Sequence, residues 1–99
     1  MIVVIGQFRL PVHSLSEARN LMAQVVADTR REAGCLTYSY SEDVTEPGLI
    51  HASETWESRE ALTAHFKTPH MIRWQAERQR LGMTGRVVMA YAVAAGEAL

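Results

Sequence analysis

Two histidines, His65 and His70, are the residues of this chain best suited to acid–base chemistry. Neutral imidazole accepts protons near neutral pH, because its unperturbed pKa is about 6.5, and a positioned base typically contributes about 10²–10⁴-fold to a rate. His65 shares a helical face with apolar neighbours and is predicted to point inward, so it is the first candidate for a base. His70 opens the next predicted helix, whose dipole keeps an imidazole neutral, and it is the second. Each could instead be a hydrogen-bonded core residue.

Aromatic and polar residues near these histidines could hold a substrate. Trp56, Phe66 and Trp74 would wall a dry apolar pocket that suits a flat aromatic molecule, although Trp56 could simply pack in the core. Glu54 lies on the same side of a predicted strand as Trp56, and could orient a histidine or the substrate, or pair with a nearby arginine. Gln7 is the polar exception in an apolar strand and could reach into a cavity, or merely mark the strand end.

The sequence contains no other recognised catalytic motif. The segment from Gly82 to Gly85 lacks the preceding strand that a phosphate-binding loop requires. His65 and His70 are five positions apart with a proline between them, not the four that place two ligands on one helix face, so no metal site is predicted. The single cysteine, Cys35, cannot form an internal disulfide, and a reducing cytoplasm is expected.

Composition narrows the class of protein further. The 99 residues are expected to form one domain, 1–99, and a hydrophobic fraction of 47% argues against disorder. The net charge is −1 and the sequence has no cluster of basic residues, so it does not indicate nucleic-acid binding. No apolar run approaches the roughly 20 residues that cross a bilayer. The apolar start, residues 1–6, is interpreted as a strand, not a signal peptide.

Hydrophobic periodicity and end signals divide the chain into strands and helices. Strands are predicted at about 1–9, 35–44, 48–56 and 86–95, and helices at about 14–33, from 58 to before Pro69, and at 69–81. Ser14 and Glu17 match a capping box, Ser58 and Thr68 are predicted N-caps, and Gly82 is predicted to end the last helix. Polar residues of that helix are predicted to be solvated: Arg73, Glu77, Arg78 and Arg80.

The order β-α-β-β-α-β predicts an α+β protein with a ferredoxin-like antiparallel sheet and helices on one side. The first and last strands are apolar on both faces, and the helices can cover only one of these faces. A second copy of the same sheet is the economical cover for the other. We therefore predict a homodimer whose sheets pack face to face as an eight-stranded barrel, with His51 on the face opposite Trp56.

Three segments resemble a known family. They are Gly-Cys-Leu-Thr-Tyr at 34–38, Glu-Thr-Trp-Glu-Ser-Arg-Glu-Ala-Leu at 54–62 and Ala-His-Phe-Lys-Thr-Pro-His at 64–70. They are similar to the antibiotic biosynthesis monooxygenase (ABM) domains, in particular to small bacterial proteins assigned as quinol monooxygenases. The resemblance implies a dimeric α+β barrel with one pocket per subunit between sheet and helices. It also implies oxygenation of an aromatic polyol with dioxygen and without metal, haem or flavin.

Position by position, the resemblance favours the quinol-type branch. Trp56 matches a site tryptophan of the anthrone-oxidising branch. The asparagine, tyrosine and arginine of that branch are replaced by Ala52, Leu62 and, allowing a one-residue gap, Gln75. The haem-degrading branch needs a histidine that also falls near Gln75. His65 and His70 are retained.

Two functions follow as hypotheses. The first is a cofactor-independent monooxygenase of a quinol or related polyphenol. The second is a non-catalytic dimeric barrel that binds a small aromatic ligand, as a stress or pathway accessory protein. The scaffold serves several activities, so fold by itself does not separate them. Oxygen uptake with quinols in metal-free buffer would do so.

Overall fold

The computed structural model describes residues 1–99. The chain folds in the order β1 (Ile2–Arg9), a 3-10 turn (Val12–Ser14), α1 (Leu15–Thr29), β2 (Cys35–Glu42), β3 (Leu49–Trp56), α2 (Arg59–His65), α3 (Pro69–Leu81) and β4 (Thr84–Ala92). None of these helices is both long and apolar enough to cross a membrane.

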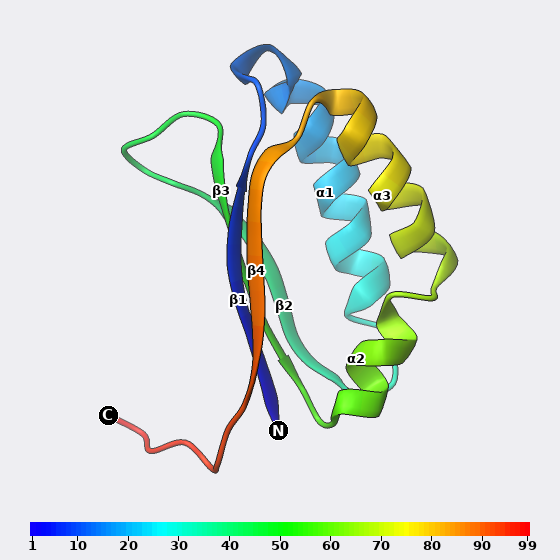
Figure 1. Ribbon diagram of the computed structural model, residues 1–99, viewed down its shortest axis with the longest axis vertical. Helices are drawn as coiled ribbons and strands as arrows, with labels where there is room; N and C mark the ends of the chain where they lie inside the picture. Colours follow the sequence, from blue (N-terminus) through cyan, green and yellow to red (C-terminus); the bar gives the residue numbers. More distant parts are fainter.

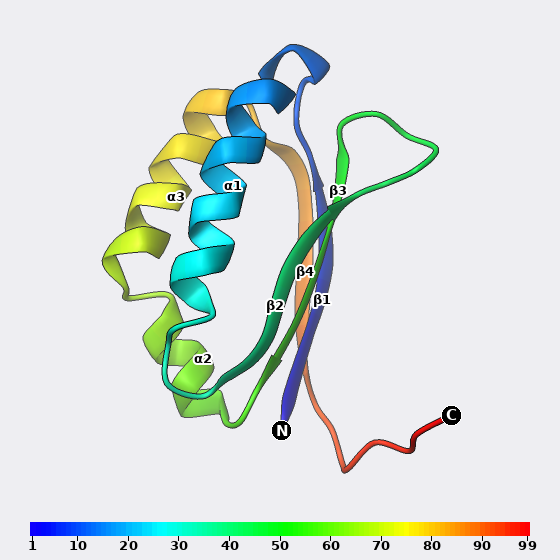
Figure 2. The same ribbon diagram turned by 180° about the vertical axis from the view of Figure 1, so that it is seen from behind.

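The strands form one sheet in the order β2-β3-β1-β4, and every neighbouring pair is antiparallel. All three helices cover the same face of this sheet, as Figures 1 and 2 show from opposite sides. The predicted ferredoxin-like α+β fold is therefore confirmed. β1 and β3 lie in the centre of the sheet, whereas β2 and β4 are its two edges.

The core lies between the helices and the inner face of the sheet. Side chains at alternate strand positions, such as Val4, Phe8, Ile50 and Trp56, are almost completely buried there. Facing them is the apolar stripe of α1, which contributes Ala18, Met22 and Val25. Burial of one such large side chain stabilises the fold by about 1.5–3 kcal/mol, so this single layer holds the helices on the sheet.

The outer face of the sheet is apolar along β1 and β4 and is not covered by any part of the chain (Figure 1). Ile5 is 57% exposed, Val87 58%, Met89 52% and Tyr91 50%. These four residues lie on neighbouring antiparallel strands, in which Ile5 pairs with Met89. They form one apolar patch, of a kind that usually marks an interaction surface.

The predicted N-caps of the last two helices, and the predicted end of the last helix at Gly82, are confirmed. The hydroxyl oxygen of Ser58 accepts a hydrogen bond from Ala61 N at 3.1 Å, and that of Thr68 accepts one from Met71 N at 3.4 Å. Pro69 is the first residue of α3, and Gly82 ends this helix with a φ of 91°.

Three predicted elements end a few residues earlier than expected. The first helix ends at Thr29 instead of about 33, and a turn follows it. The last strand runs from Thr84 to Ala92 instead of 86–95. The second strand ends at Glu42, because Asp43 Oδ1 accepts bonds from Thr45 N and Glu46 N and so closes the loop.

The predicted capping box at Ser14 is wrong. Ser14 belongs to the 3-10 turn, and its side chain caps no helix N–H. Instead Ser14 Oγ donates a buried hydrogen bond to the Leu81 carbonyl at 3.0 Å. A tertiary bond to the end of α3 thus replaces the local one that the motif suggested.

We expect Ser14→Ala to lower the free energy of unfolding by about 1 kcal/mol, because it leaves the Leu81 carbonyl without this partner. Ser16→Ala is the matched control, since Ser16 is exposed on α1 and makes no side-chain hydrogen bond. Urea denaturation would measure both. Equal stabilities of the two variants would contradict a role of the Ser14–Leu81 bond.

Candidate functional site

α2 positions His65 at the centre of the inner layer. The helix begins behind the Ser58 cap, and His65 is its last residue. Thr68 Oγ1 donates a hydrogen bond to the His65 carbonyl at 2.7 Å, which closes the end of the helix. The imidazole points toward the sheet, as its helical face predicts, and is 1% exposed.

Aromatic rings surround the His65 imidazole. Its centroid lies 4.8 Å from the nearer ring centroid of Trp56, 5.3 Å from Tyr38 and 5.2 Å from Phe66. Burial lowers the pKa of His65 below its ordinary value, and a hydrogen bond from the ring to Glu32 opposes this effect. The neutral imidazole, which is the form that accepts a proton, is thereby favoured.

A carboxylate that the sequence did not reveal holds both histidines. Glu32 Oε2 lies 2.8 Å from His65 Nδ1 and 2.7 Å from His70 Nε2. Because a carboxylate only accepts hydrogen bonds, neutral His65 carries its proton on Nδ1, and its Nε2 is left as the free acceptor. His70 Nε2 also lies 3.2 Å from Thr68 Oγ1. The arrangement is that of a histidine base oriented by a carboxylate.

The turn between α1 and β2 brings Glu32 to the histidines. Gly34 in this turn has a φ of 83°, and a Cβ at this position would lie 2.5 Å from the Cβ of Ala61 on α2. The turn also accepts a hydrogen bond at the Gly34 carbonyl from Glu57 N at 2.9 Å. Glycine at position 34 therefore allows the close approach of turn and helix that places Glu32 under His65.

Glu32, His65 and His70 are also the one group of side chains close enough together to suggest a metal ion. Their ligand atoms lie within 4.8 Å of one another. Both nitrogens, however, are at hydrogen-bonding distance from the same carboxylate oxygen, whereas zinc would hold each ligand at about 2.0–2.2 Å from itself. As it stands, the group is a hydrogen-bonded network.

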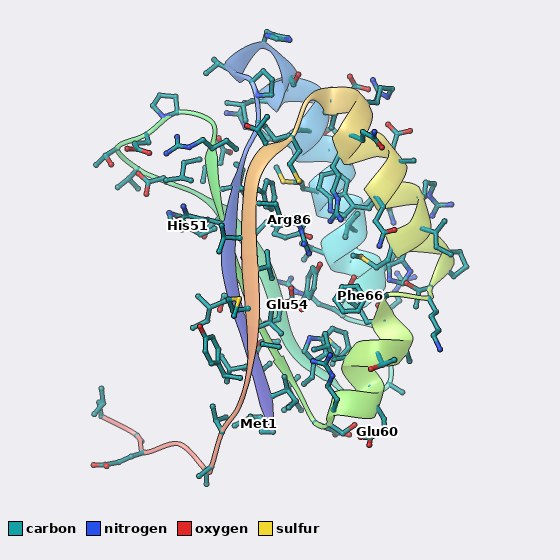
Figure 3. All side chains as sticks on the ribbon, viewed as in Figure 1. Met1, His51, Glu54, Glu60, Phe66 and Arg86 are labelled. Carbon is teal, nitrogen blue, oxygen red and sulfur yellow. The ribbon has the colours of Figure 1, made fainter.

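A cavity of about 520 Å³ lies beside this network, between α2 and α3 and the inner side of β1 and β4. Its lining residues are Val4, Arg59, Leu62, Phe66, Gln75, Arg78, Arg86, Val88, Met89 and Ala90. In Figure 3, Phe66 and Arg86 point into the space between helices and sheet. The volume is suitable for a small aromatic ligand, since such sites usually measure about 300–1,000 Å³.

The predicted site residues divide between this cavity and the core. Phe66, which is 41% exposed, lines the cavity. Trp56 is fully buried, and its Nε1–H donates to Glu54 Oε1 at 2.9 Å. Burial raises the pKa of Glu54, and the Trp56 bond partly offsets the rise. Glu54 points into the same space between the layers (Figure 3).

Trp74, His70 and Gln7 lie away from the cavity. Trp74 is 1% exposed, packs at 6.1 Å from the Tyr40 ring, and has a buried Nε1 without a partner. Together with His70 it borders a separate groove of about 310 Å³ between α1 and α3. Gln7 lies on the outer face of the sheet, beside His51 (labelled in Figure 3).

Several cavity residues escaped the sequence reasoning. Arg78 was predicted to be solvated but is half-buried in the cavity wall. Arg86 lies on the same strand face as Val88, so extending the alternation of the last strand by one step would have found it. Leu62 and Gln75, which replace site residues of the anthrone-oxidising branch, both line the cavity. No local signal marked Glu32.

Acid is expected to destabilise the fold through His65. Because burial lowers the pKa of His65 in the folded chain, the unfolded chain binds the proton more readily below its own pKa of about 6.5. The contribution is fully present above that pH and is lost as the pH falls, by at most about 1.4 kcal/mol per pH unit. Urea denaturation at pH 7, 6 and 5 should show a steeper loss for the native sequence than for His65→Asn.

His13→Asn is the control for this pH dependence, because His13 is exposed in the 3-10 turn. It should keep the native pH slope. The raised pKa of Glu54 acts in the opposite direction, but it is common to all three proteins and cancels in the comparison. An unchanged slope in His65→Asn would contradict the role given to burial of this imidazole.

Known proteins match this chain along most of its length. The family model described as "Antibiotic biosynthesis monooxygenase" matches residues 1–77. The crystal structure of a Deinococcus radiodurans protein, provisionally named an antibiotic biosynthesis monooxygenase, superposes with a TM-score of 0.89 at 29% identity, covering 100% of this chain and 96% of that one. The structure of Rv0793 from Mycobacterium tuberculosis gives 0.86 at 27% identity, covering 98% of each chain.

Two curated relatives agree with this result. Rv0793, provisionally named a monooxygenase, is 30% identical over 76 residues, which are 77% of this chain and 74% of that protein. The uncharacterized protein sll1783 of Synechocystis sp. is 36% identical over 69 residues, 70% of this chain. This match spans about half, 47%, of the Synechocystis protein. By sequence and by fold, the chain belongs to the antibiotic biosynthesis monooxygenase family.

Proposed function

We propose that the protein is a cofactor-independent monooxygenase that oxidises a quinol or a related polyphenolic aromatic compound with dioxygen. Membership of the family and a cavity of aromatic size support the proposal. The observation that carries it is the hydrogen bond between Glu32 and the buried His65, which leaves the Nε2 of a neutral imidazole as a proton acceptor. Phe66, whose ring centroid lies 5.2 Å from that of the imidazole, lines the cavity. We expect the protein to act in the cytoplasm.

In the proposed reaction, His65 Nε2 removes a phenolic proton. The resulting anion gives one electron to dioxygen, and the two radicals then combine to form a carbon–oxygen bond on the ring. Loss of water leaves a hydroxyquinone, so that quinol and dioxygen together give hydroxyquinone and one water. Glu32 stabilises the protonated imidazole through its bond to Nδ1.

Phe66 would control access to the base. Leu62 on α2 and Phe66, which directly follows this helix, line the cavity, whereas the His65 imidazole does not line it and is 1% exposed. The partly exposed Phe66 ring can change rotamer rapidly, on a picosecond to nanosecond timescale. Its displacement would let a substrate hydroxyl approach His65.

Oxygen uptake with a panel of reduced quinols, in buffer treated with chelator, tests the proposal. Heat-denatured protein serves as the blank, because quinols oxidise slowly without a catalyst. We expect enzyme-dependent uptake, and we expect His65→Asn to lower kcat by about 10²–10⁴-fold, the usual contribution of a positioned base. His13→Asn should leave the rate unchanged, since His13 is exposed and does not line the cavity.

The alternative function is a non-catalytic barrel that binds a small aromatic ligand. The nearly complete burial of His65 favours this alternative, because no substrate touches the ring unless side chains move. Binding of quinols without uptake above the blank would support it and would contradict the enzymatic proposal. Uptake that persists in His65→Asn would instead show that another group is the base.

We further propose that the protein is a homodimer in which the outer faces of two sheets pack as an eight-stranded barrel. The patch of Ile5, Val87, Met89 and Tyr91 supports this, because it leaves four large apolar side chains at least half exposed on one face of the sheet. In a dimer with a two-fold axis, this patch on one subunit would pack against the same patch on the other.

Met89→Lys tests the dimer, because it places a charge in the middle of the patch. Sedimentation equilibrium should give about twice the chain mass of 11.1 kDa for the native sequence and about the single mass for the variant. Ile72→Lys is the matched control: Ile72 is 59% exposed on α3, away from the patch, and should leave the dimer intact. A native protein that sediments as one chain would contradict the proposal.

A further inference from the structure

Three arginines from different elements meet at the cavity between the helices and β4. Arg59 is the first residue of α2, Arg78 lies on α3, and Arg86 lies on the inner side of β4. Apart from Gln75, the other lining residues are apolar. No aspartate or glutamate lines the cavity, so its wall carries only positive formal charge.

None of these three arginines has an ion-pair partner in the chain. Of the other six arginines, three are paired: Arg9 with Glu46, Arg19 with Glu42, and Arg80 with Glu17 and Glu77. Arg30, Arg31 and Arg73 make no ion pair either. Three of the six arginines without an ion pair therefore line one cavity. Since a partly buried cation without a counter-charge is unfavourable, the site is suited to receive an anion.

The electrostatics of Arg78 support this interpretation. Arg78 is half-buried, and burial, followed by the positive charge of Arg86, lowers the pKa of its guanidinium. Glu54 is the one buried acidic residue of the chain; it feels the charge of Arg86, but it accepts a hydrogen bond from Trp56 Nε1 and does not line the cavity. Repulsion between the two guanidinium groups would be relieved by an anionic group placed between them.

We infer that the cavity binds a hydroxylated aromatic carboxylate, with the ring against Leu62, Phe66 and Val88 and the carboxylate held by Arg78 and Arg86. The planar guanidinium fork matches a carboxylate with two parallel hydrogen bonds. A volume of about 520 Å³ has room for a bicyclic ring. The inference deepens the proposed function by naming the substrate class, and it rests on the same cavity being the binding site.

Two fluorescent probes test the inference: 3-hydroxy-2-naphthoate and 2-naphthol, which share a bicyclic ring and a hydroxyl and differ by the carboxylate. In fluorescence titrations at pH 7 the carboxylate should bind at least about tenfold more tightly, the usual effect of a hydrogen bond to a charged group. Arg78→Gln and Arg86→Gln should each remove most of this advantage while affecting 2-naphthol little.

Arg73→Gln is the control, because Arg73 lies on α3 but faces the groove between α1 and α3 instead of the cavity. It should keep the native preference. Arg86 is exposed, so its replacement is not expected to unfold the chain even if that of the half-buried Arg78 does. Equal binding of the two probes, no binding of either, or a preference that survives in Arg86→Gln would overturn the inference.

The binding titrations and the oxygen-uptake assay test the two proposals independently. Carboxylate-selective binding without oxygen uptake would support the inference and contradict the proposed enzyme activity. Oxygen uptake with neutral quinols, together with equal binding of the two probes, would support the activity and overturn the inference about substrate class.

Discussion

One carboxylate oxygen, Oε2 of Glu32, connects three parts of the chain that are far apart in sequence. It lies on the turn after α1 and accepts hydrogen bonds from His65 at the end of α2 and from His70 at the start of α3. A buried carboxylate is stable only when it is hydrogen-bonded, and each imidazole in turn needs an acceptor. Each of the three side chains therefore fixes the position of the other two, and together they hold the junction of α2 and α3 in place.

The inner layer holds two groups of polar residues on different sides of α2. On the side of α2 toward β2, His65 contacts Glu32 and the buried rings of Tyr38 and Trp56. The side toward β4 carries the cavity with unpaired arginines. Glu54 lies between them, bonded to Trp56 and within the field of Arg86. A ligand in the cavity would thus meet a fixed positive potential on one side and a proton acceptor behind Phe66 on the other.

The ordering of strands and helices could be predicted because its signals are local. Alternation along β1 and β3, the caps at Ser58 and Thr68, and Gly82 each depend on residues within one turn or one strand. The capping box at Ser14 failed for the opposite reason: its hydroxyl found a better acceptor in Leu81, which is 67 positions away. Local motifs are reliable only where no tertiary partner competes for the same atoms.

By itself the sequence determined the fold class, the inward direction of His65 and the two apolar faces of the sheet, since these follow from periodicity. Only the tertiary structure decided which groups meet. The contact of Glu32 with His65 and His70 spans 33 and 38 positions. The cavity gathers Arg59, Arg78 and Arg86 from three elements. Such contacts depend on how helices are seated on the sheet, and no short-range pattern encodes that geometry.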